Sequence, residues 1–343
     1  MHRLAPAPPA LLAAALILAA ARPAAAGAQA ATTAAPWMAA PYKDVSLHVD
    51  PAAPRITAQW RPQALQPLPD RGLHGPALVW AFATGTCGQE RWGPFDTEAF
   101  ARLNVAAFRA AGVGYILSTG GEAGGFECDS DAGMARFIQR YDSPQLLGVD
   151  FDIERQQSAA QIDALVQRAA TLARARPALR ISFTLATHAG SDATARSLNA
   201  TGALVLGALQ RHGPPHAIIN LMVMNYGQAD ARWCVVDQGR CDMGRSALQA
   251  ARNLHLQFGV PYARIALTAM PGLNDVRGNV FTLADAQVMA AGARALGLAG
   301  VHHWSLDRDQ ACAGDAARVA PDCHGLSGVA AGSFRALLTD PAH

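Results

Sequence analysis

Short apolar runs of β-strand type alternate along this chain with longer amphipathic stretches of helical type. The eight strand-like runs lie at residues 45–49, 77–83, 113–118, 146–153, 180–186, 218–224, 264–270 and 300–305. The helical patterns lie at residues 97–111, 132–141, 159–175, 193–212, 243–258, 283–296 and 328–338. Such alternation is typical of repeated βα units around a parallel sheet. Eight strands over about 300 residues predict an α/β fold, a single-domain (β/α)8 TIM barrel.

The fourth run reads LLGVDFDIE and places Asp150, Asp152 and Glu154 at alternate positions. In a strand these three side chains share one face. Clustered carboxylates repel, so the pKa of at least one should be raised, as a general acid requires. A solvated edge strand is the alternative, but the flanking apolar residues argue against it. We interpret the segment as the active site, with Asp150 deepest and Glu154 at the rim.

Polar residues also follow three other strands, at the ends where the chemistry of a barrel is found. The sequence STGG at 118–121 closes the third strand, NYG at 225–227 the sixth, and WSLD at 304–307 the eighth. Four segments therefore face one mouth. Of the two methionines on one face of the sixth strand, we expect Met224 to line the site and Met222 to fill the barrel.

The N-terminus has the layout of a secretory signal peptide over residues 1–28. A short basic start precedes an apolar stretch around residues 11–21, and small residues follow. That stretch is shorter than the roughly 20 residues of a membrane span. We expect a flexible leader over residues 29–40, the barrel over 41–340, and a secreted protein, extracellular or periplasmic.

The charges are nearly balanced, with 28 basic and 26 acidic residues and no basic run. Nucleic-acid binding proteins usually carry a basic patch or stripe. We therefore expect no nucleic-acid partner. We also expect no membrane partner after signal cleavage, and a monomer.

The six cysteines are an even number, as in exported proteins with disulfides. Sequence alone does not determine their connectivity. The pairing that we favour joins cysteines that bracket short loops and leaves the other two to each other: Cys234 with Cys241, Cys312 with Cys323, and Cys87 with Cys128.

Taken together, these motifs resemble glycoside hydrolase family 18. The matching segments are the D-x-D-x-E of strand four in GVDFDIE (148–154), the S-x-G-G of strand three in LSTGG (117–121), the Met/Tyr segment of strand six in MVMNYG (222–227), and the tryptophan of strand eight in HHWSLD (302–307). The segments APYKDV (40–45) and WAFATGTCGQERWG (80–93) look like the opening of bacterial chitinases. Four motifs in the right order are more specific than any one alone.

The resemblance implies a retaining cleavage in which the 2-acetamido oxygen of the substrate replaces a protein nucleophile. It implies that Glu154 is the general acid and base and that Asp152 holds the acetamido N–H. Asp150 would raise the pKa of Asp152 or share its proton. The Tyr226 hydroxyl would donate to the acetamido carbonyl.

The same resemblance implies a substrate-binding set. Trp304 would form an apolar floor for the sugar, unless it is a core tryptophan. Ser118 would support the acids, and Gly121 belongs to a tight turn beside them. Asn225 departs from the family, in which many members have an aspartate at or beside this position. An amide could hold sugar groups but adds no charge, and a simple turn residue is the alternative.

The function that the resemblance implies is hydrolysis of β-1,4-linked N-acetylglucosamine in chitin or chitooligosaccharides, without a metal or another cofactor. An endo-β-N-acetylglucosaminidase acting on N-glycans would share the catalytic strand, so the loops would decide between the two. A chitin-binding lectin on the same barrel would typically lack the acid that Glu154 provides. A metal-dependent hydrolase would need histidines that the neighbouring strand ends lack. Endo or exo action is not readable from the sequence.

Overall fold

The computed structural model describes residues 1–2, 36–50, 53–60, 66–68, 77–154, 157–315 and 317–340. The chain divides into two units, residues 1–33 and 34–343, and the fold below is that of the second. The predicted signal peptide, apart from its first two residues, and the leader as far as residue 35 lie outside the described residues.

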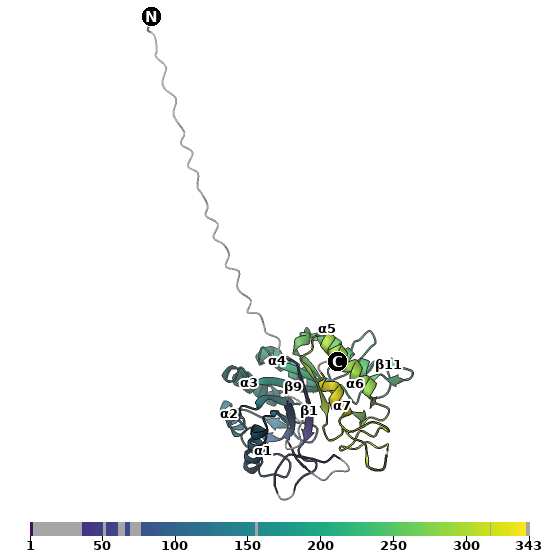
Figure 1. Ribbon diagram of the computed structural model, residues 1–343. Coiled ribbons are helices and arrows are strands. Elements are labelled where there is room, and N and C mark those ends of the chain that lie inside the picture. Colours follow the sequence, from purple (N-terminus) through teal and green to yellow (C-terminus); the bar gives the residue numbers. More distant parts are fainter. Residues whose placement is uncertain are drawn as a thin grey trace. The chain divides into compact units, whose positions relative to one another are not determined.

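Eight parallel strands close into a barrel (Figure 1). In chain order, which is also their order around the barrel, they are β1 (Met38–Asp44), β4 (Ala77–Ala83), β6 (Gly114–Gly120), β8 (Leu146–Asp152), β9 (Arg180–Ala186), β10 (Ile218–Met222), β13 (Ile265–Ala269) and β16 (Gly300–Trp304). β16 pairs back onto β1, which closes the sheet. The predicted TIM barrel is confirmed.

Helices surround the strands (Figure 1). They are α1 (Thr97–Ala111), α2 (Asp131–Arg140), α3 (Ala159–Ala175), α4 (Ala200–His212), α5 (Met243–Phe258), α6 (Leu283–Ala295) and α7 (Ser333–Thr339), with 3-10 turns at Tyr262–Arg264 and Ala313–Asp315. Polar residues begin most of them, as in α3, where Ser158 and Gln161 form a reciprocal capping box. None of the described helices spans a membrane, because none is both long and apolar enough.

Short strand pairs lie in the connections. They are β2 (Thr57–Ala58) with β3 (Gln66–Pro67), β5 (Gly85–Thr86) with β7 (Phe126–Glu127), β11 (Val236–Asp237) with β12 (Arg240–Cys241), and β14 (Gly272–Leu273) with β15 (Val280–Phe281). The β2–β3 pair lies between β1 and β4, where the described residues contain no helix.

The first strand was predicted wrongly. It is Met38–Asp44 rather than 45–49, so residues 38–40 belong to the barrel and not to the leader. Its sequence MAAPYKD has no β-branched residue, and Pro41 cannot donate a backbone hydrogen bond. Pairing with β16 and β4 nevertheless buries it, and Lys43 is neutralised inside by Asp307 at 2.9 Å.

Two helices are shorter than predicted, because a cap sets where each begins. Asn199 accepts a hydrogen bond from the backbone N–H of Gly202, so α4 begins at Ala200 rather than at 193. α7 begins at Ser333 rather than at 328. There the carboxylate of Asp309 accepts the backbone N–H groups of Phe334 and Arg335.

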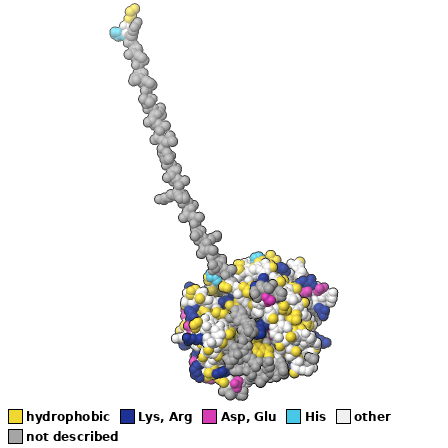
Figure 2. Space-filling model, in the orientation of Figure 1, with side chains coloured by type: hydrophobic (Ala, Val, Ile, Leu, Met, Phe, Trp, Pro, Cys, Tyr) yellow, Lys and Arg dark blue, Asp and Glu magenta, His cyan; other side chains and the backbone are white. Residues whose placement is uncertain are grey.

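The alternation in β8 separates two environments. Val149 and Phe151 pack in the large apolar core that includes the surrounding helices. Asp150 points inward, where it meets polar side chains of other strands. On the face shown in Figure 2, acidic and basic side chains are interspersed with apolar and neutral ones.

All three predicted disulfides are confirmed. They join Cys87 to Cys128, Cys234 to Cys241, and Cys312 to Cys323. The first joins the segment after β4 to the segment after β6, and so ties two loops at the mouth of the barrel.

Candidate active site

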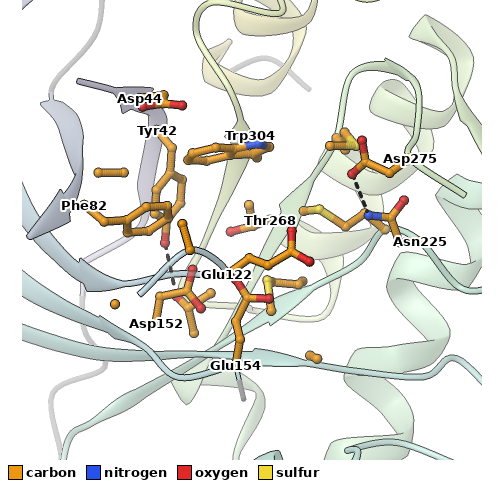
Figure 3. Close-up of a pocket in the computed structure, with 18 of the residues that line it drawn as sticks. Tyr42, Asp44, Phe82, Glu122, Asp152, Glu154, Asn225, Thr268, Asp275 and Trp304 are labelled. Atoms are coloured by element: carbon orange, nitrogen blue, oxygen red, sulfur yellow. Dashed lines mark hydrogen bonds between the residues drawn. The ribbon is translucent and has the colours of Figure 1, made fainter. Parts of the chain in front are cut away.

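A cavity of about 570 Å³ opens at the carboxyl ends of the barrel strands. Five of the nine predicted site residues line it: Asp152, Glu154, Met224, Asn225 and Trp304. Figure 3 shows Asp152 and Glu154 on one side, with Trp304 and Phe82 above and Asn225 with Asp275 across the space. The convergence of strand ends that the sequence predicts is therefore present.

Asp150 lies beneath the cavity and is 1% exposed. Its Oδ2 accepts hydrogen bonds from the hydroxyls of Tyr42 (2.9 Å) and Ser118 (2.7 Å). Its Oδ1 accepts from Ser182 (2.6 Å) and Thr184 (2.8 Å). Burial raises the pKa of this carboxyl, while the four hydroxyl donors favour its ionised form and oppose the rise.

Asp152 lies above Asp150 and is also buried. Its Oδ1 has no hydrogen-bond partner among the described residues. Burial raises the pKa of Asp152 well above its usual value, and the nearby charges of Glu154 and Asp150 raise it further. Asp152 therefore keeps its proton to a higher pH than an ordinary aspartate does.

Glu154 follows the end of β8 and lies at the rim, half-buried and lining the cavity. Figure 3 shows its carboxyl group in the same space as those of Asp152 and Glu122. The graded depth that the sequence predicts for the three acids is therefore observed: Asp150 lies below the cavity, Asp152 in its wall, and Glu154 at its opening.

Aromatic side chains form one wall. The rings of Trp304 and Phe82 stack with centroids 5.2 Å apart and an angle of 19° between their planes. Tyr42 lies 6.2 Å from Trp304 between centroids. Trp304 was predicted from the sequence, whereas Phe82 and Tyr42 were not, although both lie in the segments that resemble the opening of bacterial chitinases.

Two glycines at the end of β6 allow close packing, one beside β8 and the other beside the aromatic wall. Gly120 has φ +87°, and a Cβ there would lie 2.0 Å from the carbonyl oxygen of Asp152. Gly121 has φ +83°, and a Cβ there would lie 2.7 Å from the ring of Phe82. Gly121 therefore does not line the cavity but leaves room for Phe82, which does.

Tyr226 and Ser118 do not line the cavity either. Tyr226 is 4% exposed, and its hydroxyl is buried with no hydrogen-bond partner among the described residues. Burial raises its pKa well above the usual value. The hydroxyl therefore keeps an unused donor, and its expected contact with the acetamido carbonyl stays a prediction. Ser118 supports the acids from below, through Asp150.

Both methionines of strand six contribute to the cavity. Met224 lines it as predicted, and Met222, which was expected only to fill the barrel, lines it as well. Asn225 has a left-handed backbone at φ +53°. Asn tolerates this conformation better than most residues, because its short polar side chain can bond locally.

The cavity is acidic. Asp44, Glu122 and Asp275 line it in addition to Asp152 and Glu154, and none of the described lining residues is lysine or arginine. His188 is the one histidine among them, and burial together with Arg196 lowers its pKa. Glu122 and Asp275 lie in loops outside the motifs, so the sequence offered no means of selecting them. Asp44 ends β1 within the segment at 40–45 that resembles bacterial chitinases, but it was not selected from the sequence. No group of three or more His, Cys, Asp or Glu among the described residues has the arrangement of a metal site.

No family profile matches the chain. Over 276 residues it is 28% identical to a probable bifunctional chitinase/lysozyme of Escherichia coli strain K12, covering 73% of this chain and 29% of that protein. Over 251 residues it is 28% identical to endochitinase 11 of Metarhizium anisopliae, covering 66% of this chain and 45% of that protein. The chain thus spans less than half the length of these curated relatives.

Solved structures share the fold. The catalytic domain of a hyperthermophilic chitinase from Pyrococcus furiosus has a TM-score of 0.66 at 24% identity, over 89% of this chain and 95% of that one. A family GH18 chitinase from Chromobacterium violaceum has a TM-score of 0.50 at 17% identity, over 87% of this chain and 83% of that one. The chain is therefore chitinase-like in sequence and in fold, and the resemblance that its motifs indicate is confirmed.

Proposed function

We propose that this chain is a secreted glycoside hydrolase that cleaves β-1,4-linked N-acetylglucosamine in chitin or chitooligosaccharides. The observation that carries the proposal is the graded burial of Asp150, Asp152 and Glu154, from below one cavity to its opening, with a raised pKa at Asp152. The similarity to chitinases supports the substrate class. The three disulfides and the signal-like N-terminus support export.

Glu154 is the general acid, since it is the outermost of the three acids and lines the opening. Because the charge of Glu154 raises the pKa of Asp152, ionising both is unfavourable, and the mechanism assigns one proton to the pair. When that proton is on Glu154, it is delivered to the glycosidic oxygen as the bond from C1 to that oxygen breaks. The acetamido oxygen of the substrate bonds to C1 from the opposite face, which gives a cyclic oxazolinium ion.

Asp152 is left ionised by this proton transfer. Its Oδ1, which has no hydrogen-bond partner among the described residues, accepts the acetamido N–H and stabilises the positive charge of the ring. Asp150 acts through its charge rather than by taking the proton, because four hydroxyl donors already occupy its oxygens. Glu154 then removes a proton from water as the hydroxide bonds to C1, which restores the acetamido group with retention of configuration.

The apolar wall positions the sugar. The Trp304 ring, held by stacking on Phe82, offers a flat surface to the C–H face of the ring and to the acetamido methyl. Met224 and Met222 complete the apolar part of the lining.

The test is hydrolysis of chitooligosaccharides and of a high-mannose glycoprotein by the wild type and by Glu154→Gln. We expect cleavage of the oligosaccharides, loss of about 10² to 10⁴ in rate for Glu154→Gln, and inhibition by a thiazoline analogue of the oxazolinium ion. The matched control is Glu98→Gln, which makes the same change at an exposed site on α1. Release from neither substrate would contradict the proposal, and release from the glycoprotein alone would identify an N-glycan hydrolase instead.

A further inference from the structure

The side chain of Asn225 is bonded to the loop after β13 at both of its polar ends. Its Nδ2 donates to Oδ2 of Asp275 at 3.1 Å, and its Oδ1 accepts the backbone N–H of Val276 at 3.1 Å. Figure 3 shows the bond to Asp275 on the side of the cavity away from Phe82. Asn225 is thus not a simple turn residue, and both polar atoms of its side chain already have partners within the protein.

This arrangement requires an amide. A carboxylate at position 225 could still accept from Val276, but it could not donate to Asp275, and the two negative charges would repel. The amide therefore holds a carboxylate of the neighbouring strand end at the cavity. The negative charge that position 225 lacks is supplied by Asp275.

The loop that carries Asp275 is tied to the strand-six segment at several points. The backbone N–H of Asn225 donates to Asn274 at 3.2 Å, and that of Tyr226 donates to Asn279 at 2.7 Å. Asn279 Nδ2 donates to the carbonyl of Gly227 at 2.8 Å. Asn274 and Asn279 are both buried, so the position of Asp275 is set by a bonded framework rather than by a loose loop.

Asp275 itself is exposed and lines the cavity. One of its oxygens accepts from Asn225, and its Oδ1 has no hydrogen-bond partner among the described residues. An ionised carboxylate is a strong acceptor for hydroxyl and amide donors. Sugar hydroxyls and acetamido N–H groups are the donors that a chitooligosaccharide presents.

We propose that Asp275 binds substrate through its Oδ1, accepting a hydroxyl or amide hydrogen of the glycan, and that Asn225 is the positioning residue that holds this carboxylate at the cavity. The inference rests on the proposed function and names a contact of the same site. It predicts that the effects of substitutions at positions 225 and 275 on substrate binding are not additive.

The test is calorimetric binding of a chitooligosaccharide in the inactive Glu154→Gln background, which measures affinity independently of cleavage. Asp275→Asn should weaken binding about tenfold to a hundredfold, the loss typical of a hydrogen bond to a charged group. Asn225→Asp should weaken it similarly, because repulsion moves the Asp275 carboxylate away. The double variant Asn225→Asp/Asp275→Asn, in which an amide again faces a carboxylate, should bind no more weakly than Asp275→Asn alone, because the carboxylate that position 225 holds is already absent.

The matched control is Asp163→Asn, which removes a carboxylate from an exposed ion pair on α3. In the active enzyme, Asp275→Asn should raise KM and leave the pH dependence of kcat unchanged, and its melting temperature should equal that of the wild type. Binding by Asp275→Asn within about twofold of the parent would overturn the inference, as would a weakening that only follows a loss of fold stability. Absence of binding by Glu154→Gln itself would overturn the proposed function, and this inference with it.

Discussion

The hydroxyl of Tyr42 on β1 donates to Oδ2 of Asp150 on β8 at 2.9 Å, across a sequence separation of 108 residues. The same hydroxyl accepts from Asn220 Nδ2 on β10 at 3.0 Å. Tyr42 thereby links the first, fourth and sixth barrel strands beneath the cavity. It also touches Trp304, so the polar floor and the aromatic wall meet at one residue.

Tyr42→Phe removes a donor from buried Asp150 and an acceptor from buried Asn220. We expect the free energy of unfolding to fall by about 1–3 kcal/mol, as for buried polar groups left without partners. The pKa of Asp150 should rise further, because one hydrogen bond that favours its ionised form is lost. Urea unfolding at pH 7 measures the first effect, and an unchanged midpoint would contradict it.

Asp152→Asn should stabilise the fold increasingly as the pH rises. The folded-state pKa of Asp152 is raised, so above the unfolded value of about 3.9 the unfolded chain loses its proton first. Wild-type stability therefore falls with rising pH up to the folded pKa, and an amide removes that dependence. Melting curves from pH 4 to pH 8 should show that the melting temperature of the variant increases relative to that of the wild type as the pH rises.

Asp150→Asn serves as the contrast in that experiment. Its two oxygens accept four hydroxyl groups, and an amide nitrogen in place of one oxygen cannot accept. We expect it to be destabilised by about 1–3 kcal/mol. Equal changes in stability for Asp150→Asn and Asp152→Asn would show that the different burial of the two acids does not give them different roles in the fold.

Trp304→Ala should weaken chitooligosaccharide binding about tenfold to a hundredfold, because it removes the apolar surface proposed to contact the sugar. Trp304→Phe should retain most of the affinity, since a smaller ring can still stack on Phe82. Calorimetric binding to the Glu154→Gln form measures both variants. Equal affinities for alanine and tryptophan at this position would remove Trp304 from the substrate contacts.

The disulfides should differ in their contribution to stability. Cys87 and Cys128 are separated by 41 residues, and Cys234 and Cys241 by 7. Loop-closure entropy gives about 4 kcal/mol for the first and about 2.5 kcal/mol for the second. Paired Cys→Ala variants compared by urea unfolding should show the larger loss at Cys87–Cys128, and the reverse order would contradict the chain-entropy explanation.

Local patterns predicted most of the barrel, because strands buried on both faces and helices with one apolar face have distinct periodicities. The helices at 97–111, 159–175 and 243–258 were predicted with their observed bounds. β1 was missed because its sequence is a poor strand former and is stabilised only by its neighbours. Its burial depends on pairing with β16, which is the last barrel strand in the chain.

The sequence by itself determined that Asp150, Asp152 and Glu154 share one face of a strand, since alternation is a property of the local backbone. It also determined which strand ends carry polar groups. Only the tertiary structure decided that the Tyr226 hydroxyl is buried without a partner among the described residues, that Phe82 and Tyr42 line the cavity, and that Asn225 is hydrogen-bonded to Asp275. Those relationships join loops and strands that are distant in the chain, and their geometry depends on barrel closure, which no local pattern encodes.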